Sequence, residues 1–74
     1  MRKRSITIKG HRTSISLEPA FWEALGRLAK QDGRSLPDLV AEIDRRRLAE
    51  TPPSGLASAL RVYALNRLGA RDET

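Results

Sequence analysis

A short alternation of polar and apolar residues that leads directly into a helix constrains this chain most. Residues 12–17 alternate with a period of two, which predicts a strand with one apolar and one polar face. The apolar face carries Thr13, Ile15 and Leu17, and the polar face carries Arg12, Ser14 and Ser16. Because a single strand cannot satisfy its own backbone hydrogen-bonding groups, residues 12–17 need a second strand beside them.

Two sources of that second strand are open in the sequence. Residues 5–9, Ser-Ile-Thr-Ile-Lys, alternate in the same way, and Gly10 separates them from residues 12–17. Either the chain turns at Lys9-Gly10-His11 and makes a hairpin, or it continues as one long kinked strand. In a dimer, residues 12–17 of two copies can instead pair antiparallel across a two-fold axis.

Three helices are predicted after the strand. They cover about residues 19–32, 36–50 and 55–68. Pro19 suits the first position of the first helix, and Gly33 suits its C-terminal end. Ser35 predicts the N-cap of the second helix, with Asp38 three residues later as in a capping box. The break before the third helix is Thr-Pro-Pro at 51–53.

The length of the chain, 74 residues, predicts a single domain over 1–74. Its expected parts are a basic arm or extra strand at 1–11, a core at 12–50 and an additional helix at 54–68. There is no Cys and only one His, so neither disulfides nor a metal is expected to stabilise so small a core. Oligomerisation is the remaining common way in which so small a domain is stabilised. The residues expected in a dimer core are Ile15, Leu17, Phe21, Trp22, Leu25, Leu28, Leu39, Val40 and Ile43.

The whole chain has a formal net charge of +5, and its positive charge is concentrated at the start. Arg2, Lys3, Arg4, Lys9 and Arg12 lie within the first 17 residues, which contain no Asp or Glu. A basic segment of this kind is the usual electrostatic footprint of a nucleic-acid binder, although a solvated tail has the same composition.

The segments described so far resemble the ribbon-helix-helix family of bacterial repressors and antitoxins, of the MetJ/Arc/CopG type. The resemblance is carried by Arg-Thr-Ser-Ile-Ser-Leu at 12–17, by Pro19, and by Gly-Arg-Ser at 33–35. Residues 11–22 also resemble a subgroup of short bacterial ribbon-helix-helix domain proteins, which tend to have a further helix like residues 58–62. The resemblance implies a mostly α fold with a short β-ribbon and a third C-terminal helix, in an intertwined homodimer.

The resemblance also implies a homodimeric DNA-binding transcriptional regulator that inserts an antiparallel β-ribbon into the major groove of double-stranded DNA. The residues that would contact base edges are Arg12, Ser14 and Ser16. Arginine can bond guanine bidentately, and serine hydroxyls can donate or accept at several bases. The residues that would contact phosphates are Arg4, Lys9, Arg34, Ser35 and Leu36. The last three open the second helix, whose N-terminal amides and dipole favour an anion.

The spare strand at 5–9 and the third helix leave a second interpretation open. In it, a ribbon-helix-helix scaffold binds a protein partner, like an antitoxin or an adaptor, with little or no DNA binding. If residues 5–9 fold back on 12–17, a ribbon paired across a dimer would have four strands, against a groove about 12 Å wide. The third helix either packs on the core or recruits a second dimer or a protein partner.

Other functional classes find little support in the sequence. With a lone His and no Cys, no nucleophile–base pair of the usual kind is present, so we expect neither an enzyme nor a cofactor. No apolar run approaches the roughly 20 residues that a membrane span needs. The basic start is followed by Ser-Ile-Thr-Ile and not by a long apolar segment, so we expect no signal peptide and a cytoplasmic location.

Overall fold

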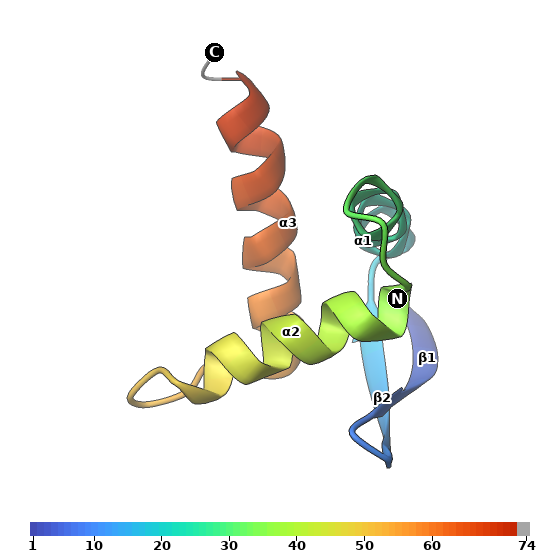
Figure 1. Ribbon diagram of the computed structural model, residues 1–74, viewed down its shortest axis with the longest axis vertical. Coiled ribbons are helices and arrows are strands. Elements are labelled where there is room, and N and C mark those ends of the chain that lie inside the picture. Colours follow the sequence, from blue (N-terminus) through green and yellow to red (C-terminus); the bar gives the residue numbers. More distant parts are fainter. Residues whose placement is uncertain (73–74) are drawn as a thin grey trace.

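Two strands and three helices follow one another in the computed structural model, which describes residues 1–72 (Figure 1). They are β1 (Arg2–Ile8), β2 (His11–Leu17), α1 (Pro19–Gln31), α2 (Leu36–Leu48) and α3 (Leu56–Asp72). This order confirms the predicted mostly α fold with a short β-ribbon and a third C-terminal helix. The predicted ends of α1 and α2 differ from those observed by one or two residues, whereas α3 continues past the predicted end at 68.

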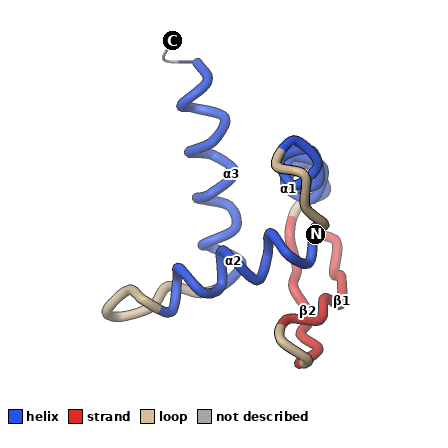
Figure 2. The backbone as a smooth tube through the Cα atoms, in the orientation of Figure 1, coloured by secondary structure: helices blue, strands red, loops and turns tan. Residues whose placement is uncertain are grey.

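The two strands form a hairpin, which answers the question that the sequence left open at residues 5–9 (Figure 2). β1 and β2 pair antiparallel, from Arg2 opposite Leu17 to Ile8 opposite His11. Lys9 and Gly10 form the turn with φ values of 52° and 80°, the positive values that a two-residue type I′ turn requires. Both strands of the ribbon therefore come from one copy of the chain.

Lys9 is the residue of this turn that fits its conformation least well. An L-residue with a side chain in the left-handed region is destabilised by about 1–2 kcal/mol, and asparagine tolerates that region better than most. We expect Lys9→Asn to raise the free energy of unfolding by up to about 1 kcal/mol. Urea denaturation checks this, and Lys9→Ala, which removes the same charge without relieving the backbone, should give no gain. A gain of equal size in both variants would contradict the explanation.

The hairpin has one face toward the helices and one toward solvent. Ile6 and Ile8 from β1, with Ile15 and Leu17 from β2, point toward the helices, and none of the four is more than 8% exposed. Successive side chains of a strand point to opposite faces, so the residues between them point away from the helices. The alternation seen in the sequence is thus the alternation between core and solvent.

The junction between α1 and α2 is built by the predicted Gly-Arg-Ser segment. Gly33 has φ +69°, and the Arg34 amide donates a 3.0 Å hydrogen bond to the carbonyl of Ala29, which closes α1 in a Schellman-type cap. Ser35 then caps α2, since its hydroxyl oxygen accepts a 3.2 Å hydrogen bond from the Asp38 amide. The chain therefore changes direction here with its backbone groups largely satisfied.

A single hydrophobic core joins the hairpin to all three helices. Its buried members are Ile6, Ile8, Ile15, Leu17, Trp22, Leu25, Leu28, Ala29, Leu39, Val40, Ile43, Leu60 and Ala64. The residues expected in a dimer core are thus buried within one chain, apart from Phe21, which is partly buried against the core. Leu60 and Ala64 come from α3, so this helix completes the domain and is not an appendage to it.

Trp22 joins β1 to α1. Its side chain is 5% exposed, and its indole Nε1 donates a 2.9 Å hydrogen bond to the carbonyl of Arg2. The guanidinium carbon of Arg4 lies 5.3 Å from the centroid of the Trp22 ring, within cation–π range. One aromatic side chain therefore fills core volume and also holds the first strand by a specific polar contact.

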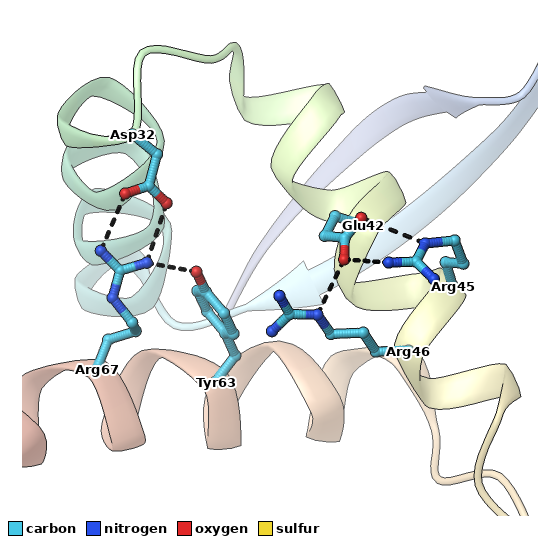
Figure 3. Close-up of polar contacts among 6 residues, drawn as sticks. All are labelled: Asp32, Glu42, Arg45, Arg46, Tyr63 and Arg67. Atoms are coloured by element: carbon cyan, nitrogen blue, oxygen red, sulfur yellow. Dashed lines mark hydrogen bonds and ion pairs between the residues drawn. The ribbon is translucent and has the colours of Figure 1, made fainter.

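Two ion pairs join α3 to the two ends of α1. At the start of α1, Arg61 donates to Glu18 over 2.9 Å. At its end, Arg67 donates to both carboxylate oxygens of Asp32, over 3.0 and 3.1 Å, and also to the hydroxyl of Tyr63 (Figure 3). These pairs fix how α3 lies against the rest of the domain.

The Asp32–Arg67 pair is expected to make stability depend on pH in the acid range. Its hydrogen bonds hold the pKa of Asp32 below the ordinary value of 3.8. The stabilisation is therefore complete above that ordinary value and is lost as the pH falls through the folded-state pKa. We expect Asp32→Asn to lower the melting temperature at neutral pH, and the difference from the native chain to vanish in acid.

Thermal melts of both proteins across this pH range check the expectation. Glu23→Gln, at an exposed carboxylate of the same helix, is the matched control and should melt close to the native chain throughout. A deficit of Asp32→Asn that persists unchanged in acid would mean that the ion pair is not its source.

Candidate nucleic-acid interface

The solvent-facing side of the hairpin presents two rows of polar side chains. We call it the outer face, and it consists of Lys3, Ser5 and Thr7 from β1 and Arg12, Ser14 and Ser16 from β2. Lys3 lies opposite Ser16, Ser5 opposite Ser14, and Thr7 opposite Arg12. All of these side chains are exposed. The three residues expected to contact bases are therefore brought together on one face, as their spacing predicted.

The β1 half of the outer face was missed in the sequence. Its signal was present, because Lys3, Ser5 and Thr7 stand at every second position, as the polar residues of 12–17 do. Arg2, Lys3 and Arg4 are all charged, so polar and apolar residues alternate visibly only from residue 5, and the sequence leaves the pairing with residues 12–17 open. Once the hairpin register is known, these three residues must share a face with Arg12.

The outer face is basic and rich in hydroxyl groups. Lys3 stands near the open end of the hairpin and Arg12 near the turn, with hydroxyl side chains at the remaining four positions. Neither strand contains a carboxylate. Hydroxyls can both donate and accept, and arginine matches the two acceptors of guanine, so this surface suits the edges of base pairs and the phosphates beside them.

Two residues expected to contact phosphate differ in their positions. Lys9 lies at the tip of the hairpin and extends the basic surface beyond Arg12. Arg4 belongs to the opposite face of β1, where its guanidinium stacks over Trp22. The structure therefore separates Arg4 from the outer face, and it gives no geometric support to a phosphate contact by Arg4 alongside Arg12.

The remaining expected phosphate contacts lie at the start of α2. Arg34 and Ser35 are exposed there, and Leu36 is half-buried. The Asp38 amide already donates to the Ser35 hydroxyl, and Pro37 has no N–H to offer. Within the first turn, the Leu36 amide is thus left to receive an anion, so this end of α2 offers few donors.

Sites of other kinds are not seen in the described part of the chain. Within residues 1–72, no helix combines the length and apolar character needed to cross a bilayer. The same residues contain no cluster of three or more His, Cys, Asp or Glu side chains that could hold a metal ion.

Sequence comparison points to the same fold as the structure. The family described as "Ribbon-helix-helix domain" matches residues 1–68, which span the hairpin, α1, α2 and most of α3. No curated protein and no solved structure matches the chain. Domains of this family typically form dimers and occur in DNA-binding regulators without catalytic activity. The hairpin, the Gly-Arg-Ser junction between two helices and the family match together establish that the chain belongs to the ribbon-helix-helix family.

Proposed function

We propose that this protein is a homodimeric, cytoplasmic transcriptional regulator, of repressor type, that places the outer face of its hairpin in the major groove of DNA. The observation that carries the proposal is a two-stranded ribbon with an exposed, acid-free face that bears Lys3 and Arg12. A β-ribbon is one of the two elements that the major groove admits. Membership of a family of DNA-binding regulators supports the same function.

The width of the ribbon supports entry of one hairpin at a time. Neighbouring strands lie about 4.8 Å apart, so two strands fit easily into a groove about 12 Å wide. Four strands would span about 14 Å between the outermost backbones, before any side chain is added. In this proposal a single two-stranded hairpin therefore enters the groove at each contact.

The side chains of the outer face take distinct roles in the proposal. Arg12 binds guanine bidentately and carries most of the direct readout, while Ser14 and Ser16 contact adjacent base edges. Lys3 and Lys9, at the two ends of the hairpin, bind phosphates. At the start of α2, Arg34 and the backbone of residues 35 and 36 add a further phosphate contact.

Titration of duplex DNA at several salt concentrations tests the proposal. The logarithm of the affinity should fall linearly with the logarithm of the salt concentration, with a slope of about 0.9 for each phosphate neutralised. Lys3→Ala should reduce this slope by about one and weaken binding to all sequences alike. Absence of duplex binding at low salt would reject the function.

A second candidate function is that of an adaptor for a protein partner with little DNA binding. It is favoured by a groove of about 420 Å³ between the C-terminal half of α2 and α3, to whose lining Ile43, Val62 and Tyr63 contribute. The two candidates make opposite predictions in the salt titration, because an adaptor needs no affinity for the duplex.

A further inference from the structure

The outer face of the hairpin has an internal two-fold symmetry. β1 and β2 pair antiparallel, and two antiparallel strands are related by a local two-fold axis that stands perpendicular to the ribbon. Ser5 lies opposite Ser14 at the middle of the outer face, so the axis passes between these two residues. The residues that this axis relates are Lys3 and Arg12, Ser5 and Ser14, and Thr7 and Ser16. One chain therefore carries two related halves of a single surface.

The chemistry of the outer face follows this axis. In each strand a basic residue comes first, and hydroxyl residues stand at the second and fourth positions after it. β1 has the pattern Lys-x-Ser-x-Thr over 3–7, and β2 has the pattern Arg-x-Ser-x-Ser over 12–16. All six side chains are exposed, and neither strand contains a carboxylate that would interrupt the pattern. Each half of the outer face therefore offers DNA one cation and two hydroxyl groups.

Both halves of the outer face face the floor of the groove when one hairpin enters it. Opposite side chains of an antiparallel pair have Cβ atoms about 4.5–5.5 Å apart, well below the groove width of about 12 Å. Thr7 lies opposite Arg12, so where Arg12 meets a guanine, Thr7 stands within reach of an adjacent base edge. Its hydroxyl can donate or accept a hydrogen bond, and its methyl group can pack on the methyl of thymine. These positions favour base contact by β1 as well as by β2.

The symmetry of the outer face matches a symmetry of the duplex. The two strands of DNA are antiparallel, so an inverted repeat presents the same base edges on either side of its centre, and a protein surface with two-fold symmetry binds such a repeat. Position 3 lies about 13 Å along the ribbon from the level of position 12, which corresponds to about four base-pair steps of B-DNA. A repeat contacted by one hairpin is therefore much shorter than the spacing of about 10 base pairs between the half-sites of a dimer.

Lys3 and Arg12 are the related residues that differ most. The guanidinium of Arg12 is a planar fork that matches the two acceptors of guanine, whereas the ammonium of Lys3 is a point charge on a flexible stem, which suits a phosphate. The half of the outer face formed by β1 thus lacks a planar guanine contact, although its hydroxyl residues correspond to those of β2. The repeat is therefore expected to be imperfect, with guanine required on one side only.

We propose that Ser5 and Thr7 of β1 determine base specificity together with the three outer residues of β2, and that the site of each hairpin is a short, imperfect inverted repeat. Ser5 contacts the base edge that the local axis relates to the one at Ser14, and Thr7 contacts the base edge related to the one at Ser16. Lys3 binds a phosphate where the repeat is imperfect. This inference rests on the proposed function, because it requires the outer face to lie in the major groove.

Replacing Lys3 with arginine tests the symmetry by a gain of specificity. Lys3→Arg gives both halves a guanidinium, so sites selected from a random duplex library should acquire a second guanine on the opposite DNA strand, at the position that the local axis relates to the first. In fluorescence anisotropy, the preference for a duplex with both guanines over a duplex with one should rise at least about fivefold relative to the native chain.

Lys9→Arg is the matched control for this gain. Lys9 lies in the turn, outside the two related halves, and the exchange of side chains is the same. Its selected sites should be those of the native chain. If Lys3→Arg selects no second guanine, or selects one away from the related position, the symmetry is overturned.

Alanine variants of β1 test base contact by its hydroxyl residues. Ser5→Ala and Thr7→Ala should each reduce discrimination at one base pair by about twofold to tenfold, the effect of losing one hydrogen bond. Thr7→Ser, which keeps the hydroxyl, should retain most of the discrimination at its base pair. Both positions are exposed, so each variant should keep the native circular dichroism spectrum. Native discrimination in both alanine variants would exclude base contact by β1.

The same measurements separate this inference from the proposed function. Absence of duplex binding by the native chain rejects both. Duplex binding that depends on Arg12, with base preferences that no variant of β1 changes, overturns this inference and leaves the proposed function in place.

Discussion

Replacing Trp22 with alanine is expected to lower the free energy of unfolding by about 3–5 kcal/mol, the range for removal of a buried aromatic side chain. The side chain is 5% exposed, and its loss would open a cavity between β1 and α1. A chain of 74 residues has a total stability of roughly 4–11 kcal/mol, so this single change removes a large part of it. Urea denaturation followed by circular dichroism checks the size of the loss.

Two further variants separate the contributions of Trp22. Trp22→Phe keeps most of the apolar area but removes the Nε1 donor to the Arg2 carbonyl. It should lose about 1–2 kcal/mol, with faster hydrogen exchange of the β1 amides. Phe21→Ala, at a partly buried neighbour, should lose less than Trp22→Ala. Equal losses in the free energy of unfolding at positions 21 and 22 would contradict a larger contribution of Trp22 to stability.

Replacing Arg12 with alanine is expected to weaken binding to a preferred duplex by about 1–3 kcal/mol, or roughly 5- to 150-fold. Arg12 is the one arginine of the outer face, its planar guanidinium matches the two acceptors of guanine, and its β-strand holds it exposed. Fluorescence anisotropy at fixed salt, with preferred and unrelated duplexes, checks the loss and shows whether discrimination between them narrows.

Arg27→Ala is the matched control for this measurement. Arg27 is exposed on α1, and its replacement removes the same single charge from the chain without altering the hairpin. A small loss in this variant would report only the change in net charge. If both variants lost the same affinity for the preferred duplex, Arg12 would act through charge alone and base readout by the outer face would be excluded.

The parts of the fold that the sequence predicted are those specified by local signals. The period of two at 12–17 predicted which residues of β2 are buried. The junction was predictable because Gly33 can adopt a positive φ and Ser35 can cap a helix, and both properties belong to single residues. α3 passed its predicted end because Gly69 only weakens a helix, by about 1 kcal/mol, and does not stop it.

The pairing of the strands was harder to predict, since it depends on contacts distant in sequence. A hairpin and a ribbon shared between copies both satisfy the backbone groups of residues 12–17, so hydrogen bonding alone could not choose between them. Lys9 before Gly10 is also a weak turn signal compared with Asn-Gly. Arg4 was assigned to DNA from its charge, although its even number places it on the same face of β1 as Ile6 and Ile8.

The hairpin and the core are both complete within one copy, and this has a consequence for how the protein is made. We therefore expect folding to be a first-order process, whose rate does not depend on how many chains are present. An intertwined dimer, in contrast, folds only as fast as two chains meet, and its stability cannot be separated from its concentration. On this expectation, a newly synthesised copy of this chain reaches its native state while still alone, and assembly follows as a separate, reversible equilibrium between folded molecules. Under the proposed function, the cell could then adjust occupancy of the target by the amount of protein, without passing through an unfolded chain.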